Sequence, residues 1–516
     1  MKILQSNALV LGLLFVLLTL SKTSNGFSCN LADADEKPRI FVLSDISNEP
    51  DDTQSMVRLL LHSDQLDIQG LVATTSYWLN SSTHADQIHA VIDGYAKVYN
   101  NLKIHGIGQY PTPKYLKALV RSGPSVYGMA SISDEGVSEG AQLLIDAVES
   151  SSKPLWVQVW GGAAVLGEAL NRIQRARTEK DTKNFMSRLR VYSISDQDDV
   201  GVWIRREFPS VFYLSSVHGW NQYGLALWTG ISGEGHYGFD KGGPDTELVT
   251  NEWVKKNIQI GPLGSLYPDI MFIMEGDSPA LLYTLQNGLN APEHPSWGGW
   301  GGRYTPTSLS GKSQHYADTV DRVTGKDGRL FLSNHATIWR WREAFQNEFA
   351  ARIQWTLTKD YQKTPHPPSV VVNASCSNTP LEMRVCPGSR LVFDASQSQD
   401  PLTGTHESLI FKWWQYRDIT ATQWSVEHEV PELKISFAES DPRNLVATIE
   451  IPSIEEACRS PKALHASSKL QRVCQSYHLI LEVKNGGDIP LTRYRRMVFN
   501  VINDSKCATE GSHDEL

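Results

Sequence analysis

The chain has 516 residues, which is enough for two or three domains that each bury a core of their own. Its net charge of -9 is spread along the chain with no long basic run, so nucleic acid is disfavoured as a partner. Hydrophobic residues make up 41% of the composition, which indicates a folded, soluble and mildly acidic protein.

The two ends of the sequence predict where the protein resides. Residues 1–26 carry one early lysine, an apolar run over residues 8–20 and then small polar residues, which is typical of a cleaved secretory signal. That run is too short to prefer a membrane span. The last four residues, His513-Asp514-Glu515-Leu516, match an endoplasmic-reticulum retrieval signal. We therefore expect a resident of the reticulum lumen that a retrieval receptor binds, with no membrane span after signal cleavage.

Cysteines and glycosylation acceptors fit that compartment. Sequons begin at Asn80, Asn373 and Asn503. One cysteine, Cys29, lies near the mature N-terminus and five lie after residue 375, so disulfides are expected in the C-terminal part. Nearest-neighbour spacing predicts the pairs Cys376 with Cys386 and Cys458 with Cys474, which leaves Cys29 and Cys507 to pair or to stay free.

An acidic turn follows the first predicted strand. Residues 40–43 form a short apolar run, and residues 53–62, with apolar side chains on one face, predict the helix that follows. Between them lie Asp45, Glu49, Asp51 and Asp52. Carboxylates this close repel one another unless a cation neutralises them, and oxygen donors suit calcium or magnesium better than zinc. The alternative is that Asp51 or Asp52 only caps the helix.

The sequence divides into two domains with different predicted secondary structure. Over residues 37–362, β-branched runs alternate with helical patterns, which predicts an α/β domain with a mainly parallel sheet and flanking helices. After the first strand and helix, the expected elements are residues 68–75 and 85–99, 154–160 and 164–173, 189–194 and 202–208, 211–214, 270–274 and 279–286. A helix over residues 337–355 is expected to close this domain.

A proline-rich stretch over residues 363–368 ends any helix and favours an extended linker. Residues 369–505 then show short alternating strands separated by turn residues, which predicts a β-sandwich. Its expected strands are residues 369–372, 390–393, 409–416, 445–451, 478–483 and 493–501. Residues 506–516 form a tail that carries the retrieval signal.

Candidate site residues follow the strands of the predicted sheet, because ligands of open α/β sheets bind beyond the carboxyl ends of the strands. Besides the aspartates of the acidic turn, they are Asn48, Glu49, Ser76, Trp78, Trp160, Gly161, Asp196, Glu275 and Asp277. Two acidic turns above one sheet edge would complete a metal cage and leave one carboxylate free as a base. The alternatives are that the glycines after Trp160 serve backbone freedom and that Asp196 caps a helix or is solvated.

A glycine-rich stretch over residues 292–304 carries His294, Trp297 and Trp300 on a segment with no helical or strand period. Flat rings beside an acidic pocket suit stacking on a base or on a sugar face, and Trp78 and Trp160 could join them. His294 is the candidate acid of this stretch. The alternative is that the rings pack under a long loop and that the histidine is plain surface.

These residues carry a resemblance to known families. The strand that ends at Asp45, with Asp51 and Asp52, resembles the N-terminal motif of the calcium-dependent nucleoside hydrolases. Nearly the whole mature chain is more closely similar to the nucleoside-hydrolase-like family of cellulose-binding Sde182-type proteins. The motifs concerned are Ser44-Asp45-Ile46, Asn48-Glu49-Pro50-Asp51-Asp52, Trp160-Gly161-Gly162, Ser195-Asp196-Gln197-Asp198-Asp199, Met274-Glu275-Gly276-Asp277 and residues 292–304.

The resemblance implies a nucleoside-hydrolase-like α/β domain followed by an immunoglobulin-like C-terminal domain. It implies that Asp45, Asp52 and, by position, Asp277 bind calcium, and that Asp51 is the general base that activates water for attack on an N-glycoside. The chain departs from nucleoside hydrolases in two places. Residues 48–50 are either an insertion that lengthens the loop before the paired aspartates or a shift of register that puts Ser47 in place of the first ligand. Residues 164 and 165 are alanine and valine where asparagine and threonine are expected.

Two functions remain open at this point. The first is a metal-dependent hydrolase, a glycosidase acting on N-glycosidic or related glycosyl bonds in the secretory pathway. The second is a non-catalytic protein that binds a cellulose-like glycan through Trp297, Trp300 and the C-terminal domain. The retained acids favour the first function, whereas the altered loop at residues 164 and 165 and the many aromatic residues favour the second.

Overall fold

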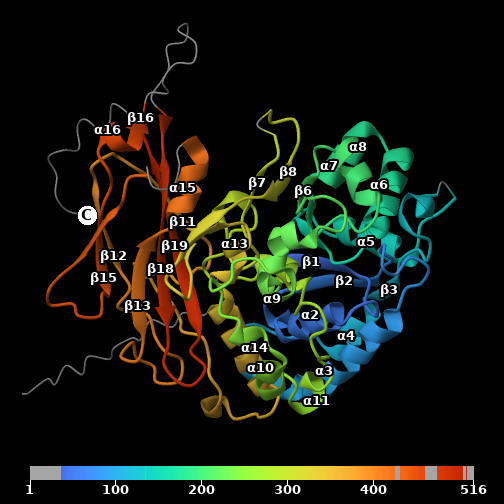
Figure 1. The fold of residues 1–516 in the computed structure, drawn as a ribbon, viewed down its shortest axis with the longest axis horizontal. Coiled ribbons are helices and arrows are strands. Elements are labelled where there is room, and N and C mark those ends of the chain that lie inside the picture. The colour runs from blue at the N-terminus through green and yellow to red at the C-terminus, as the bar shows by residue number, and fades with distance from the viewer. Residues whose placement is uncertain are drawn as a thin grey trace, which may run out of the picture.

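A computed structural model describes residues 36–133, 135–308, 310–424, 430–459, 473–503 and 507 of the chain. They form two lobes that lie side by side, an α/β domain and a β-rich C-terminal domain (Figure 1). The predicted secretory signal, Cys29 and the retrieval signal lie outside the described residues. Within the described ranges, every helix is too short or too polar to cross a membrane.

An eight-stranded sheet organises the α/β domain. Ile40 and Val42 of its central strand β1 pack on one face, and Phe41 and Leu43 pack on the other. A strand that is buried on both faces is expected where helices cover a parallel sheet. Every neighbouring pair is parallel except β7 with β8. The order is β3 (Val120–Ser122), β2 (Asp67–Ala73), β1 (Arg39–Ser44), β4 (Leu155–Val159), β5 (Leu189–Ser193), β6 (Phe212–Ser215), β8 (His315–Asp318) and β7 (Tyr304–Pro306).

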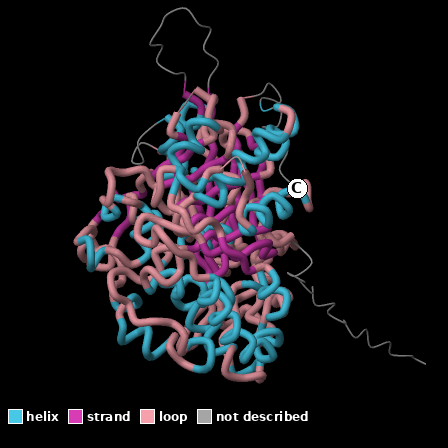
Figure 2. The backbone as a smooth tube through the Cα atoms, turned by 90° about the vertical axis from the view of Figure 1, so that its right-hand side faces the viewer, coloured by secondary structure: helices cyan, strands magenta, loops and turns pink. Residues whose placement is uncertain are grey.

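Helices cover both faces of this sheet, as predicted for this fold class. One face packs against α2 (Pro50–Leu61), α3 (Ala85–His105), α12 (Ser278–Thr284) and α14 (Arg342–Trp355). The other packs against α5 (Glu139–Glu149), α6 (Ala164–Ala176), α7 (Glu179–Met186) and α8 (Val200–Glu207). In Figure 1, α6 and α8 lie above β1 and β2, whereas α2 and α3 lie below them. The view turned by 90° shows strands through the middle of the molecule with helices outside them (Figure 2).

Shorter elements connect these layers. They are α4 (Pro113–Ala118), α9 (Glu234–Tyr237), α10 (Asn251–Asn257), α11 (Gly261–Gly264), α13 (Ala336–Trp339) and the ribbon of β9 (Asp321–Thr324) with β10 (Leu330–Ser333). The single helix predicted over residues 337–355 is therefore two helices, α13 and α14, which are separated at Arg340 and Trp341.

The C-terminal domain consists of two main sheets with a shared apolar core, as predicted for a β-sandwich. One sheet has the order β11 (Leu381–Val385), β19 (Thr492–Val501), β18 (Ser476–Lys484) and β13 (Ile410–Gln415). The other has the order β12 (Arg390–Asp394), β15 (Val446–Glu450) and β14 (Lys434–Phe437). The remaining elements are α15 (Arg417–Trp424), α16 (Ile454–Ala457) and the pair β16 (Cys458–Arg459) with β17 (Val473–Cys474).

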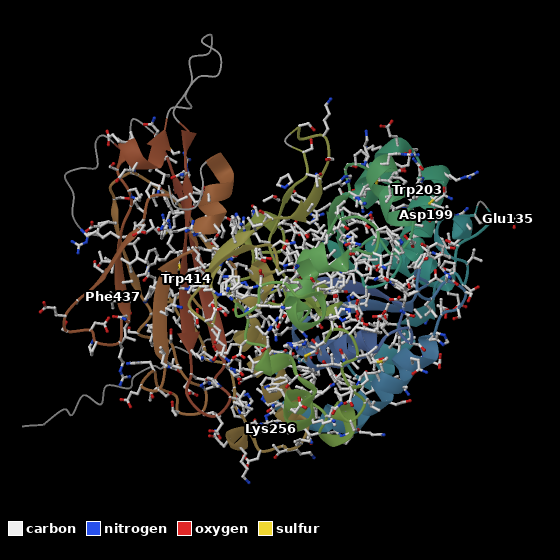
Figure 3. The ribbon with its side chains drawn as sticks, viewed as in Figure 1. Glu135, Asp199, Trp203, Lys256, Trp414 and Phe437 are labelled. Carbon is white, nitrogen blue, oxygen red and sulfur yellow. A yellow bond between two sulfur atoms is a disulfide. The ribbon has the colours of Figure 1, made fainter. Side chains whose placement is uncertain are left out.

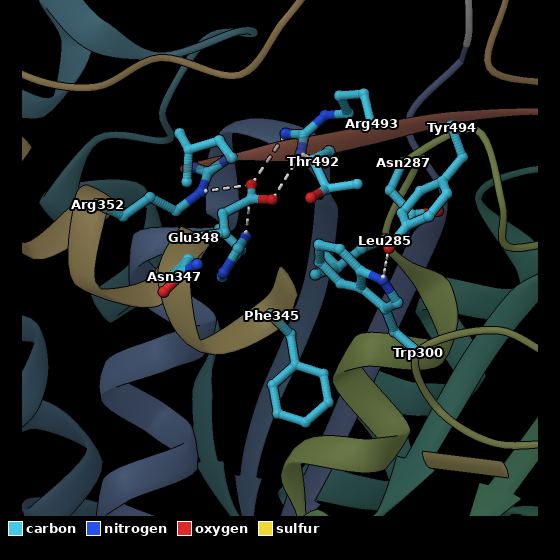
Figure 4. A network of polar contacts seen from close by, with 12 residues as sticks. Leu285, Asn287, Trp300, Phe345, Asn347, Glu348, Arg352, Thr492, Arg493 and Tyr494 are labelled. Carbon is cyan, nitrogen blue, oxygen red and sulfur yellow. Dashed lines mark hydrogen bonds and ion pairs between the residues drawn. The ribbon is translucent and has the colours of Figure 1, made fainter. Parts of the chain in front are cut away.

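Buried charges and aromatic rings join the two lobes. Arg493 of β19 donates to both oxygens of Glu348 of α14, at 2.6 and 2.9 Å, and Arg352 donates to the same carboxylate at 3.0 Å (Figure 4). Trp414 lies on the side of the sandwich that faces the α/β lobe, where its ring centroid is 6.0 Å from that of Trp341 (Figure 3). The contact between the lobes is therefore both ionic and apolar.

Two predicted strands are wrong. Residues 270–274 form no strand, because β8 occupies the sheet edge beside β6 and the Met271 side chain is 70% exposed in a loop. Residues 369–372 form only isolated bridges, in which Ser369 pairs with Gln399 and Val372 pairs with Ser375.

The disulfides differ in part from the spacing-based prediction. Cys458 pairs with Cys474 as predicted, but Cys386 pairs with Cys507 rather than with Cys376, which is disulfide-bonded as well. The reason lies in the register of the sheet. β11 pairs in parallel with β19 so that Val385 lies opposite Val501, which brings Cys386 to the segment that leads to Cys507.

Candidate active site

A cavity of about 450 Å³ opens beyond the carboxyl ends of β1 and β4. Carboxylates form one wall and aromatic rings form the others. Its lining residues are Asp45, Asn48, Glu49, Asp51, Asp52, Trp78, Trp160, Ile194, Gln197, Asn221, Tyr223, Trp228, His236, Tyr237, Phe272, Ile273 and Asp277. We call it the acid cavity. The sheet edge thus gathers side chains that lie up to 232 positions apart in the sequence, from Asp45 to Asp277.

Three carboxylates converge in the acid cavity. One oxygen atom from each of Asp51, Asp52 and Asp277 lies within 4.8 Å of the other two. Asp45, Asp52 and Asp277 are each at most 4% exposed, whereas Asp51 is partly exposed. Ser44 donates its hydroxyl to Asp52 Oδ1, but Asp277 Oδ2 has no hydrogen-bond partner among the described residues. An unpartnered buried carboxylate oxygen is costly, so it indicates that a ligand belongs there.

The pKa values of these groups report the same crowding. Burial, followed by the charges of Glu49 and Asp45, raises the pKa of Asp51 to about 7. Burial also raises the pKa of Asp45 to about 6, although a hydrogen bond with Ser76 opposes the shift. Burial and then the neighbouring aspartates hold the pKa values of Asp52 and Asp277 well above the usual carboxyl range. Each shift reflects an unneutralised negative charge, which either a proton or a cation relieves.

Strained and glycine-containing turns place the carboxylates. Ser47 and Glu275 have φ angles of 93° and 56°, an unusual conformation for residues other than glycine, and they lie in the two acidic turns. A Cβ atom on Gly161 would lie 2.6 Å from Asp45 Oδ1, and one on Gly276 would lie 2.7 Å from Asp51 Oδ2. Both glycines are therefore required for the close approach of backbone and carboxylate.

The donor set fits a hard cation. All of the converging atoms are carboxylate oxygens, which calcium and magnesium prefer, and no histidine or cysteine of the described residues belongs to the cluster. Pro50 stands at the start of α2, the Asp51 and Asp52 side chains lie in its first turn, and the N-cap residue Glu49 makes no side-chain capping hydrogen bond. The capping alternative accounts for neither the third carboxylate nor the unpartnered Asp277 oxygen.

The structure brings most of the predicted site residues together. Asp45, Asn48, Glu49, Asp51, Asp52, Trp78, Trp160 and Asp277 line the acid cavity. Ser76 hydrogen-bonds with Asp45, and Gly161 contacts the same carboxylate. The indole N–H of Trp160 is buried and has no acceptor among the described residues, so it is free to donate to a ligand.

Glu275 and Asp196 lie elsewhere. Glu275 is fully buried, pairs with Arg58 at 2.5 Å and accepts the Tyr267 hydroxyl at 2.8 Å, so it stabilises the fold and does not face a ligand. Asp196 pairs with Arg205 and lines a different cavity. Proximity to a strand end did not distinguish these carboxylates from the clustered ones, because each pairs with an arginine: Glu275 with the distant Arg58 and Asp196 with Arg205, nine positions further on.

The stretch over residues 292–304 is an interface between the lobes and lies outside the acid cavity. Trp300 is 1% exposed and packs against Tyr494 of the C-terminal domain, with ring centroids 6.3 Å apart. Trp297 lies between His294, stacked at 3.9 Å, and His478. None of His294, Trp297 and Trp300 lines the acid cavity. Trp297 and Trp300 pack against the C-terminal domain, as the packing alternative expects, whereas His294 is exposed.

Several residues of the acid cavity were not predicted. They are Asn221, Tyr223, Trp228, His236, Tyr237 and Phe272. Most come from residues 216–238, which form short helical turns and loops without a hydrophobic period. His236 is the histidine among the lining residues, and its ring lies 5.9 Å from that of Phe272. The only available signal was the local density of aromatic residues.

The substituted positions at the start of α6 do not shape the acid cavity. Ala164 and Val165 are fully buried, and Val165 packs in the core between the sheet and α5, α6 and α8. Neither is among the residues that line the acid cavity. The exchange of polar for apolar side chains therefore leaves the carboxylate cluster intact.

Comparisons with known proteins agree with this fold. The model of the cellulose-binding Sde182 nucleoside hydrolase-like domain matches residues 39–304, and the model of the cellulose-binding protein Sde0182 C-terminal domain matches residues 390–501. No curated protein matches the chain. Among solved structures, a nucleoside hydrolase-related hypothetical protein from Saccharophagus degradans, associated with carbohydrate metabolism, is similar with 27% identity and a TM-score of 0.71. That match covers 90% of this chain and 100% of the other.

A second solved structure is an inosine-uridine preferring nucleoside hydrolase from Bacillus anthracis. It has 12% identity and a TM-score of 0.31, and the match covers 63% of this chain and 100% of the other.

Proposed function

Because this chain belongs to the cellulose-binding Sde182 family with a nucleoside-hydrolase-like domain, we propose that it hydrolyses an N-glycosidic or related glycosyl bond with the help of a divalent cation in the acid cavity. The cation is calcium, since the cluster offers several carboxylate oxygen donors. The observation that carries the proposal is the convergence of Asp51, Asp52 and Asp277 within 4.8 Å, with one buried oxygen of Asp277 left without a partner.

The roles of the carboxylates follow from their burial. Asp52 and Asp277 of the converging cluster and the adjoining Asp45 are buried and would hold the cation. Asp51, the third member of the cluster, is partly exposed and can take a proton from a water molecule in the acid cavity. When bound, the cation supplies positive charge that acidifies water and orients sugar hydroxyls. It would also restore ionisation to carboxyls whose pKa values are raised in its absence.

Other side chains would position the substrate. The free indole N–H of Trp160 can donate to a sugar oxygen, and the rings of Trp78 and Tyr223 offer flat apolar walls. His236 lies in the same lining and is the candidate donor of a proton to the leaving group. Burial raises the pKa of Glu49, and the charge of the nearby His236 opposes that shift.

The test is release of reducing sugar from nucleosides and from glycosides, with calcium and with EDTA. We expect calcium-dependent turnover that Asp51→Asn lowers at least about 100-fold, the usual contribution of a general base. The matched control is Asp269→Asn, at an exposed aspartate that hydrogen-bonds only Gln259 among the described contacts. Turnover that EDTA does not reduce, or an Asp51→Asn variant as active as the control, would contradict the proposal.

A second candidate function is glycan binding without catalysis. Three neighbouring aromatic side chains at the rim of the acid cavity, Tyr77, Trp78 and Trp220, are 39–54% exposed, and the family carries the description cellulose-binding. Binding of a glycan with no turnover on any substrate would favour this function.

We also propose that the protein acts in the lumen of the endoplasmic reticulum. The support is the sequence of residues 1–26 and of residues 513–516. Asn80 is exposed in the described loop after β2, so it is accessible to glycosylation. Microscopy of the tagged protein with and without its last four residues tests this location.

A further inference from the structure

A second cavity lies beside the acid cavity, and the proposed chemistry does not use it. Its volume is about 370 Å³, and its walls include Tyr77, Tyr127, Trp220, Asp198 and Asp199. In Figure 3, Asp199 lies on the side of the α/β lobe that faces away from the sandwich, whereas Phe437 lies on the sandwich itself. We call it the aromatic cavity. Any ligand in it would therefore contact the α/β domain alone.

A layer of aromatic rings separates the two cavities. Trp78 and Tyr223 line the acid cavity, whereas Tyr77, Tyr127 and Trp220 line the aromatic cavity. The ring centroids of Tyr77 and Trp220 are 4.5 Å apart, and those of Trp78 and Trp220 are 6.1 Å apart. Trp78 Nε1 donates to the Tyr223 hydroxyl at 3.3 Å, so the rings form one continuous layer with a cavity on each side.

These rings are exposed and yet held in place. Trp220 is 54% exposed, Tyr77 46% and Trp78 39%, although large aromatic side chains are normally buried. The Tyr77 amide donates to the carbonyl of Gln197 at 2.7 Å, and the Trp78 amide donates to Ser76 Oγ at 3.1 Å. The backbone of Tyr77 and Trp78 is thus anchored, and Trp220 packs against both rings, so this exposed ring surface loses less entropy on binding than unanchored side chains would.

The polar wall of the aromatic cavity selects for hydrogen-bond donors. Asp198 is only 7% exposed, and its carboxylate accepts backbone N–H groups of Val200, at 3.0 Å, and of Ala163. Asp199 is exposed beside it. Ionised carboxylates only accept hydrogen bonds, so the ligand must supply hydroxyl or N–H groups. The exposed carboxylate of Asp199 disfavours phosphates and acidic sugars in the aromatic cavity.

We propose that the aromatic cavity is a subsite for one ring of a neutral oligosaccharide. The apolar face of the sugar stacks on Tyr77 and Trp220, and its hydroxyls donate to Asp198 and Asp199. A nucleobase offers a flat face too, but it carries fewer donors for this pair of carboxylates. This inference deepens the proposed function, on which it rests for the adjoining sugar unit at the carboxylates of the acid cavity. The substrate is then a neutral glycan of at least two units.

The test is calorimetric titration with cellohexaose in EDTA, which measures binding without turnover. We expect the wild type to bind and Trp220→Ala to bind about tenfold more weakly or worse, because one stacked ring contributes on the order of a tenfold change in affinity. Trp220 is more than half exposed, so its removal leaves the core intact. The matched control is Phe437→Ala, an exposed aromatic residue of the sandwich, which we expect to bind like the wild type.

Three results would overturn the inference. They are no binding by the wild type, equal binding by Trp220→Ala and the wild type, or a loss of binding in Phe437→Ala. Tighter binding of a nucleoside than of cellohexaose, with the same dependence on Trp220, would also overturn the assignment to sugars. Binding that depends on Trp220 without any turnover in calcium would support this subsite and contradict the hydrolase, so the two failures are distinguishable.

Discussion

Glu348 joins the two lobes, and its replacement by glutamine tests how strongly. The carboxylate is 2% exposed and accepts two hydrogen bonds from Arg493 and one from Arg352. Arg352 keeps an ion pair with Asp64 at 2.8 Å. The guanidinium of the buried Arg493 is left with only the Thr492 carbonyl as an acceptor among the described residues. Removing one partner of a buried pair costs about 3–5 kcal/mol. We expect the lower end for Glu348→Gln, since the amide oxygen still accepts one bond.

The control for this change is Glu343→Gln. Glu343 lies on the same helix and also pairs across the lobes, with Lys484 at 2.5 Å, but its side chain is 63% exposed. An exposed pair contributes about 0–1 kcal/mol. Urea denaturation followed by circular dichroism gives both free energies of unfolding. Equal losses in the two variants, or a loss below about 1 kcal/mol for Glu348→Gln, would refute the assignment of the lobe contact to this buried carboxylate.

The ion pairs of Glu348 also predict how stability depends on pH. Burial raises the pKa of Glu348, but the charges of Arg493 and Arg352 outweigh it and hold the pKa well below the usual carboxyl range. A carboxyl with a depressed pKa stabilises the fold above its unfolded pKa, about 4.3, and loses that contribution as the pH falls. The difference in unfolding free energy between wild type and Glu348→Gln should be full at neutral pH and shrink below about pH 4.

Three further predictions concern stability. Gly288→Ala should destabilise the protein by about 2 kcal/mol or more in urea denaturation, because φ is +82° and the new Cβ would lie 1.9 Å from the Tyr494 carbonyl oxygen. An unchanged free energy of unfolding would contradict this close approach. Burial lowers the pKa of His366 to about 3, so below about pH 6.5 the unfolded chain binds a proton that the folded chain does not, and stability should fall with pH. In thermal melts, the melting temperature of His366→Phe should depend less on pH than that of the wild type. The same pH dependence in both proteins would contradict this prediction. Replacing both Cys386 and Cys507 by serine removes a disulfide that closes a loop with a sequence separation of 121, and should lower the free energy of unfolding by about 4 kcal/mol. An unchanged denaturation midpoint would mean that this disulfide constrains the unfolded chain little.

Much of the fold was predictable from local patterns. Apolar runs such as residues 40–43 and helices such as α2 follow from periodicity, and the strand-end rule placed Asp45 beside the acid cavity. Asp277 lies there as well, although the strand predicted before it is a loop. The failures share one cause, which is contact with a remote element. Trp300 packs against the C-terminal domain and Glu275 pairs with Arg58, and neither partner is visible in the local sequence.

The aromatic layer was predictable only in part. Trp78 follows a strand and was collected by the strand-end rule, but Trp220 and Tyr223 come from an irregular loop after β6 that carries no periodic signal. His236 was missed for the same reason, since α9 is a single turn within that irregular region. Irregular segments lie where the tertiary contacts of the whole domain place them, so their side chains cannot be assigned to a cavity from spacing.

The central claim is that the acid cavity binds a cation through its clustered carboxylates, and calorimetric titration with calcium tests it most directly. The account predicts one binding site in the wild type and in Asp269→Asn, and none in Asp52→Asn. Because Asp52→Asn removes a buried like charge, it should fold and melt at or above the temperature of the calcium-free wild type, and it should lose the calcium-induced rise in melting temperature. No heat of binding in the wild type, or the same affinity in Asp52→Asn, would contradict the claim.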